Sequence, residues 1–389
     1  MNAPNRLPRG LHPVAWWLWA IALATAASRT TNPLLLLLIF AVLGLVVTLR
    51  RTDTPWARGY RFYLIMALTV IVIRIVFRAV FESGVAPGQA ILFRLPHIPT
   101  PPWYSGVQIG GPVSVAGVLS ATLDGARLAC LLCCIGAANT LANPKRALRV
   151  LPGALYELGV AVTVALSVAP QLVESMQRVQ RARRLRGAGG RGLRALRAIA
   201  IPVLHDALER SLRLAAGMDS RGYGRTGGAT LVSRRVTAAL MLTGLAGLCL
   251  GAYGLLDATL PRGVGFGGFG VGALLCVAGL ALGGRRVART RYRPDPWRWP
   301  EWAVTGCGVT CAVVLCLDLG APAGALNPGL YPLSWPPLPL LPTAAILVAG
   351  LAAIAAPPPP APGTAGGAAV GRLSGPAREA ALTGSGAGQ

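Results

Sequence analysis

The apolar residues of this chain are concentrated in long segments, which short basic or glycine- and proline-rich stretches separate. A helix of about 20 apolar residues spans the hydrocarbon core of a bilayer. Such a helix also satisfies its own backbone hydrogen bonds, as lipid requires. The pattern therefore predicts an all-α polytopic membrane protein with about eight transmembrane helices. Their expected ranges are 12–28, 33–49, 61–81, 113–139, 236–256, 264–283, 302–320 and 338–356.

A ninth apolar stretch, 154–173, is expected to lie along the cytoplasmic face or dip into it rather than cross the bilayer. The basic residues of 145–149 precede this stretch, and the dense basic run 176–197 follows it. Basic loops remain on the cytoplasmic side of a membrane, so a single crossing would carry one basic cluster outside. With this assignment both chain termini are cytoplasmic, and the expected location is the cell membrane.

This topology predicts four regions. An N-terminal membrane domain with four spans occupies 1–142, and a cytoplasmic coupling-helix block follows at 143–230. A C-terminal membrane domain with about four spans occupies 231–356. The Pro-, Gly- and Ala-rich tail, 357–389, is expected to be disordered. Proline and glycine make the outer loop 82–112 irregular, and it is either a connector, a lid or a partner-contacting loop.

Two helices are expected in the cytoplasmic block, at about 171–186 and 192–219. Apolar residues of the second recur every three or four positions, which is typical of an amphipathic helix. The second helix also carries acidic residues four positions before basic ones, and each such pair supports a helix by about 0.2–0.5 kcal/mol. These pairs are Asp206 with Arg210 and Glu209 with Arg213.

Both expected helices end in the same way, with an arginine in the last turn and a glycine directly after it. The two pairs are Arg186-Gly187 and Arg221-Gly222. Glycine ends a helix at little steric cost, and arginine presents a rigid fork of donors that matches carboxylates. The arginines could instead favour the helix dipole and anchor the helices to lipid head groups. Because the pair occurs twice, we favour a docking surface for a cytoplasmic partner.

The charge balance agrees with a membrane protein. Lys and Arg number 37 against 13 Asp and Glu, and only 13% of residues are charged, compared with about 25% in soluble proteins. A basic excess of this kind first reflects topology, and it also attracts the anionic head groups of the lipid bilayer. Nucleic-acid binding would need a soluble basic face with interleaved aromatic residues, so nucleic acid is not an expected partner.

The sequence contains no catalytic constellation. It has neither a Walker A loop nor an HExxH motif, so the chain is not itself an ATPase. The cysteines lie within or beside apolar runs and are expected to be small buried hydrophobes. Cys130, Cys133 and Cys134 share one helix face, but no histidine or carboxylate cluster accompanies them. We therefore expect no cofactor and no metal site.

Charged residues also occur inside the predicted spans. Arg74 and Arg78 lie in the third span, and Asp124 and Arg127 lie in the fourth. Charge inside a membrane is costly and usually faces the bundle interior, where it is paired. A functional relay is an alternative, but we favour a structural pairing of Asp124 with Arg127 or with Arg74. Arg78 lies near the outer end of its span and can snorkel.

Several motifs resemble those of one transporter family, the transmembrane T components of energy-coupling factor (ECF) transporters. The resemblance covers about residues 11–256 and includes two Ala-Arg-Gly motifs. The second of these has Ser220 in place of alanine before Arg221, and the first has Leu185 before Arg186. The other matching stretches are Leu11-His12-Pro13, Asn32-Pro33, Asn143-Pro144-Lys145-Arg146 with Leu148, and Leu166-Ser-Val-Ala-Pro170 followed by Glu174.

The resemblance implies a non-catalytic subunit of an ATP-driven uptake system for a vitamin or a metal ion. It implies two ABC-type ATP-binding subunits as partners, with Arg186, Gly187, Ser220, Arg221 and Gly222 at the docking positions. It also implies a small substrate-binding membrane subunit, which would set selectivity. Two alternatives are a polytopic membrane enzyme, such as a lipid or glycan transferase, and a stand-alone secondary transporter. A transferase should show acidic or histidine clusters in loops, and a secondary transporter should show an internal repeat.

Overall fold

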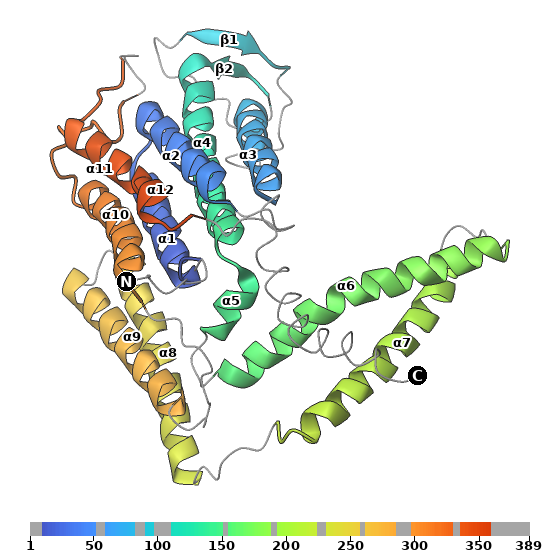
Figure 1. Cartoon of the computed structure of the whole chain (residues 1–389). Coiled ribbons are helices and arrows are strands. Elements are labelled where there is room, and N and C mark those ends of the chain that lie inside the picture. The colour runs from blue at the N-terminus through green and yellow to red at the C-terminus, as the bar shows by residue number, and fades with distance from the viewer. Residues whose placement is uncertain are drawn as a thin grey trace, which may run out of the picture. The chain divides into compact units, whose positions relative to one another are not determined.

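A computed structural model gives the helices and strands of most of the chain (Figure 1). The predicted tail from residue 359 onward and most of the outer loop 82–112 lie outside the described residues. The ranges that the structure describes are 10–51, 59–81, 90–96, 110–150, 155–187, 193–223, 231–256, 261–284, 297–329 and 335–358.

All eight segments that the sequence predicts to be spans are helical. The helices are α1 (Pro13–Arg29), α2 (Pro33–Arg50), α3 (Tyr60–Phe81), α4 (Val115–Leu141), α5 (Pro144–Arg149), α6 (Tyr156–Leu185), α7 (Leu193–Asp219), α8 (Leu231–Leu256), α9 (Arg262–Gly284), α10 (Trp299–Cys316), α11 (Leu340–Gly350) and α12 (Ala352–Ala355).

Among the described residues, seven helices have at least 18 residues and enough apolar character to cross a membrane, which makes this a polytopic membrane protein. Six of them coincide with predicted spans, and the seventh is the stretch Glu157–Leu185 of α6. Two predicted spans are shorter than that length. They are α1, with 17 residues, and the apolar stretch Leu340–Ala355.

The base of the outer loop is more regular than the sequence predicts. Strand β1 (Ile91–Arg94) pairs antiparallel with β2 (Pro112–Ser114). Beyond the strands, the backbone N–H of Leu95 donates to the carbonyl of Gly111 at 2.9 Å, and Gly111 donates back to Leu95 at 3.2 Å. In an irregular loop, the backbone N–H and C=O groups would bond to water. Here the strand pairing satisfies them instead.

The chain divides into two units. The first unit contains Met1–Pro144 together with Asp295–Gln389, and the second contains Lys145–Pro294. The structure thus places α10 to α12 with α1 to α4, whereas the sequence predicts one C-terminal membrane domain over 231–356. The apolar character of a segment indicates that it is a span but does not indicate which neighbour it packs against.

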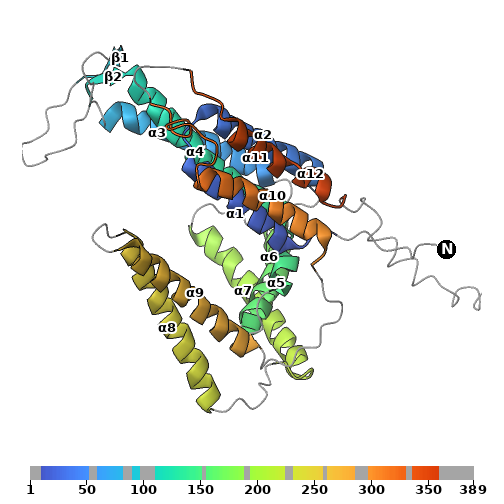
Figure 2. The ribbon, with the colours of Figure 1, turned by 90° about the vertical axis from the view of Figure 1, so that its left-hand side faces the viewer.

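The first unit has its core where α1, α2, α4, α10 and α11 meet, and α10 and α11 lie beside α1 and α2 in both views (Figures 1 and 2). Trp19 of α1 is fully buried, and its indole Nε1 donates to the carbonyl of Ala349 in α11 at 3.0 Å. Helix α3 packs mainly on α4 and leaves most of its apolar side chains exposed, including Phe62, Leu68 and Phe77. An exposed apolar face of this kind suits a helix that contacts lipid.

The separation of the expected spans 12–28 and 33–49 is confirmed, since α1 ends at Arg29 and α2 begins at Pro33, and Asn32 forms a polar connection at this point. Its side-chain oxygen caps α2 by accepting from the backbone N–H of Leu34 at 3.0 Å. Its amide nitrogen donates to the carbonyls of Ala325 and Pro337, at 3.0 and 2.8 Å, in the segment between α10 and α11. Asn32 is fully buried, so it ties the α1–α2 turn to the C-terminal helices.

We expect Asn32→Ala to lower the free energy of unfolding by about 3–7 kcal/mol. The substitution removes a helix cap worth about 1 kcal/mol and leaves two carbonyls without their donor, at about 1–3 kcal/mol for each unsatisfied group. Thermal unfolding of the detergent-solubilised protein, followed by tryptophan fluorescence, measures this change. The control is Asn139→Ala, because Asn139 is exposed and its side-chain amide donates to the Tyr63 hydroxyl at 2.9 Å, its one hydrogen bond among the described residues. Equal stabilities for the two variants would contradict the assignment.

In the second unit, α8 and α9 form a hairpin whose backbones approach closely. A Cβ atom on Gly251 of α8 would lie 2.6 Å from the Cα of Phe269 in α9. A Cβ atom on Gly272 would lie 2.7 Å from the carbonyl carbon of Gly247. Small residues at such contacts let transmembrane helices gain packing energy, so glycine is required where these two helices meet.

Candidate functional site

Helices α6 and α7 contain the predicted coupling region, and their bounds correct one prediction. The first helix is predicted at about 171–186, after Pro170, but α6 begins at Tyr156 and runs through that proline to Leu185. Proline removes one backbone hydrogen bond and bends a helix, but residues on both sides can continue it. The apolar stretch 154–173 and the first basic helix are therefore largely one element. The prediction of 192–219 for the second helix agrees with α7, which contains Pro202.

The C-terminus of α6 places Arg186 directly before a left-handed residue. The backbone N–H of Arg186 donates to the carbonyls of Ala182 and Arg183. Gly187 has φ +71° and donates to the carbonyl of Arg184 at 3.1 Å. A residue with a side chain is strained at this φ, so glycine permits the chain to leave the helix there. The predicted helix end at Gly187 is confirmed.

The C-terminus of α7 has the same arrangement. Gly222 has φ +73° and donates to the carbonyl of Asp219 at 2.9 Å. Tyr223 donates to the carbonyl of Met218 at 3.0 Å, which completes the bond pattern of a Schellman motif. Arg221 therefore precedes its left-handed glycine as Arg186 does, and the two arginines occupy equivalent positions at two helix ends.

We call Arg186 and Arg221 the tip arginines. Both are exposed, as are Leu185 and Ser220, the residues that precede them. The Ser220 hydroxyl donates to the carbonyl of Gly217 at 3.1 Å within its own helix. Each guanidinium is thus presented to the surroundings at the end of a long helix.

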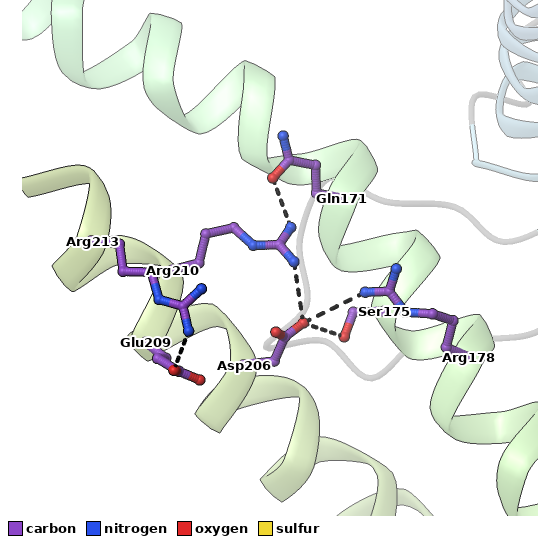
Figure 3. A network of polar contacts seen from close by, with 7 residues as sticks. All are labelled: Gln171, Ser175, Arg178, Asp206, Glu209, Arg210 and Arg213. Atoms are coloured by element: carbon purple, nitrogen blue, oxygen red, sulfur yellow. Dashed lines mark hydrogen bonds and ion pairs between the residues drawn. The ribbon is translucent and has the colours of Figure 1, made fainter. Parts of the chain in front are cut away.

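A polar network joins α6 to α7 (Figure 3). The Ser175 hydroxyl donates to Asp206 Oδ2 at 2.7 Å, and Ser175 is buried. Arg178 Nη2 lies 3.7 Å from the same oxygen. Arg210 bridges the helices, because its Nη1 donates to Gln171 Oε1 at 2.7 Å and its Nη2 lies 3.5 Å from Asp206. One carboxylate therefore receives donors from both helices.

The hydrogen bond from Ser175 has the largest effect on the pKa of Asp206 and lowers it. Desolvation opposes this shift, and the guanidinium groups of Arg210 and Arg178 reinforce it, so that the pKa lies below its usual value. Asp206 is consequently ionised at neutral pH, as its contacts with the arginines require.

Sequence reasoning found only part of this network. The ion pairs Asp206–Arg210 and Glu209–Arg213 within α7 are predicted from their spacing, and both are confirmed. The contacts of Asp206 with Ser175 and Arg178 are not predicted, because they depend on how α7 packs against α6. In the sequence alone, Ser175 is a single serine in a basic helix, and such a serine does not indicate a contact with a particular neighbouring helix.

The structure leaves the predicted intramembrane pairing as a prediction. Within the described residues, no ion pair joins Asp124 to Arg74 or to Arg127, and both Asp124 and Arg74 are exposed. The Arg127 guanidinium donates to the backbone carbonyl of Ser28 in α1. Arg74 lies against α4, where a Cβ on Gly125 would lie 3.4 Å from the Arg74 Cβ. Arg74 is therefore close to the helix segment that carries Asp124.

Comparison with known protein families matches residues 4–231 to the CbiQ family, whose description is cobalt transport protein. No curated protein matches the chain. The matched range covers α1 to α7 and reaches the first residue of α8. It includes both tip arginines and the network between their helices, whereas α9 to α12 lie beyond it. Since the match covers more than half of the 389 residues, the chain belongs to the CbiQ cobalt transport protein family, the non-catalytic transmembrane T components of ECF transport systems.

Proposed function

We propose that this chain couples ATP hydrolysis to uptake by docking on two ABC-type ATP-binding subunits through Arg186 and Arg221. Movement of the ATPases displaces α6 and α7, and the helices transmit this movement to a small substrate-binding membrane subunit. Gly187, Ser220 and Gly222 shape the two helix ends. The substrate is cobalt, another metal ion or a vitamin, and the small subunit sets its identity.

The equivalence of the two helix ends carries this proposal. Two exposed arginines each precede a glycine with φ near +70°, and each lies at the end of a helix of at least 27 residues. A protein groove that contains carboxylates can accept a guanidinium by two parallel hydrogen bonds. Two equivalent ends fit a partner that has two copies of one groove, as a pair of related ATPases would.

We further propose that α6 lies along the cytoplasmic face of the cell membrane and that both chain termini are cytoplasmic. Basic residues flank α6 on both sides, at 145–149 and at 176–197, and the positive-inside rule assigns both flanks to the cytoplasm.

The packing of α10 beside α1 supports this topology. The ring of Trp297 lies 5.5 Å from that of His12 at their first turns, and Asn327 accepts from Thr31 after their last turns. The two helices therefore run in the same direction, as this topology requires of the spans that α1 and α10 form.

Photocrosslinking in native membranes tests the docking proposal. A photoreactive residue in place of Leu185 or Ser220 is expected to capture ATP-binding cassette ATPases, because both positions are exposed beside a tip arginine. The control position is His205, which is also exposed on α7 but lies far from its end. Capture of ATPases from position 205 alone, or from none of the three positions, would reject the proposed site.

A further inference from the structure

We propose that Asp206 is a positioning residue that locks the end segments of α6 and α7 into one rigid body, so that the two tip arginines move together. This inference rests on the proposed function, because it assigns a mechanical role to the helices that carry those arginines. Its structural basis is the network of Figure 3, in which a single carboxylate contacts both helices.

The order of features along the two helices is the same. In α6, Pro170 is followed by the network residues Gln171, Ser175 and Arg178 and then by the tip. In α7, Pro202 is followed by Asp206 and Arg210 and then by the tip. Proline weakens a helix locally by removing a backbone hydrogen bond. Each helix can therefore bend at its proline, and the network joins the two segments that lie beyond the bends.

The segments beyond the network are continuous helices. Arg186 lies about three helical turns beyond Ser175, and Arg221 lies about four turns beyond Asp206. A helix of this length is stiff, so a rotation at the network displaces the tip by a distance that grows with the length of the segment. Fixing α6 to α7 at the network consequently fixes the separation of the two tips.

The negative charge of Asp206 is needed to hold the two arginines of the network close together. Arg178 and Arg210 approach one oxygen from two different helices, and without the carboxylate their like charges would repel each other. Exposed ion pairs are individually weak. Here the same oxygen also accepts from the buried Ser175, and Arg210 extends the contacts to Gln171. Linked polar contacts reinforce one another, and the low pKa of Asp206 agrees with a stabilised carboxylate.

Asp206→Asn tests this inference, because it keeps an acceptor for Ser175 but removes the charge between the two arginines. Glu209→Gln is the matched control, since it makes the same charge change in the same helix and affects only the contact with Arg213. Asp206→Glu keeps the carboxylate and should retain wild-type behaviour. Spin labels at positions 185 and 223, introduced through a noncanonical amino acid, report the separation of the helix ends in the purified chain.

We expect a broad distribution of label separations in Asp206→Asn and a narrow one in wild type, Glu209→Gln and Asp206→Glu. In the reconstituted transporter, Asp206→Asn should keep its ATPase subunits and hydrolyse ATP, but uptake per ATP should fall by about tenfold, the loss that a coupling energy of about 1.4 kcal/mol gives. A narrow distribution in Asp206→Asn would overturn the inference, as would unchanged uptake per ATP. Loss of the ATPase subunits would also overturn it, because Asp206 would then serve docking or folding.

The label measurement separates this inference from the proposed function. It uses the chain alone, so its outcome does not depend on whether ATPases bind at Arg186 and Arg221. Failure of photocrosslinking at positions 185 and 220 would reject the docking site, whereas an unchanged separation of labels would reject only the locking role of Asp206.

Discussion

Replacing both Arg186 and Arg221 by alanine is expected to abolish ATP-driven uptake while the chain still inserts into the membrane. Removing one partner of a buried charge pair at an interface costs about 2–5 kcal/mol. Even the lower value weakens binding by about 30-fold for each arginine. The side chains lie at exposed helix ends, and the bonds that end the helices are made by the backbone. The fold should therefore survive the double substitution.

The measurements are copurification of the ATP-binding subunits and uptake in reconstituted vesicles. The matched control is the double variant Arg181→Ala and Arg197→Ala, which removes one exposed arginine from the body of each helix. This control makes the same change in net charge and leaves both helix ends intact. Single variants should each retain partial binding, since one docking contact remains. Wild-type copurification of Arg186→Ala with Arg221→Ala would contradict the docking proposal, as would an equal loss in the control.

The second large effect is expected at the α8–α9 contact. Gly251→Leu should lower the free energy of unfolding by at least about 3 kcal/mol, the upper end of typical overpacking costs. The reason is that a Cβ at this position already overlaps backbone atoms of Phe269 and Gly268, at 2.6 and 2.8 Å. Backbone cannot move aside as a flexible side chain can, so the two helices must separate.

Gly267→Leu is the control for this prediction. It makes the same substitution in the same helix pair, but a Cβ on Gly267 would have no atom within 4 Å. Thermal unfolding in detergent should therefore show a large loss for Gly251→Leu and almost none for Gly267→Leu. Similar losses for both variants would contradict the assignment of the effect to close packing between α8 and α9, because leucine has a higher helix propensity than glycine at either position.

Much of the fold follows from local sequence. Asn32-Pro33 predicts the break between α1 and α2, because proline at the first helical position and asparagine as its cap act within a few residues. Gly187 and Gly222 predict the ends of α6 and α7 for a similar reason, since a left-handed φ favours glycine wherever it occurs. The start of α6 is less easily predicted, because the helix begins at Tyr156 and runs through Pro170, whereas a start at about residue 171 is expected from the sequence.

The sequence by itself determined the helical membrane fold, the helix ends and the identity of the tip arginines, because each depends on residues close together in the chain. Only the tertiary structure decided that α10 to α12 join the N-terminal helices through Asn32 and Trp19. It also decided that Asp206 receives donors from both α6 and α7. These contacts depend on which helices pack against each other. That selection is made by packing and by buried hydrogen bonds between distant segments, which hydrophobic periodicity does not encode.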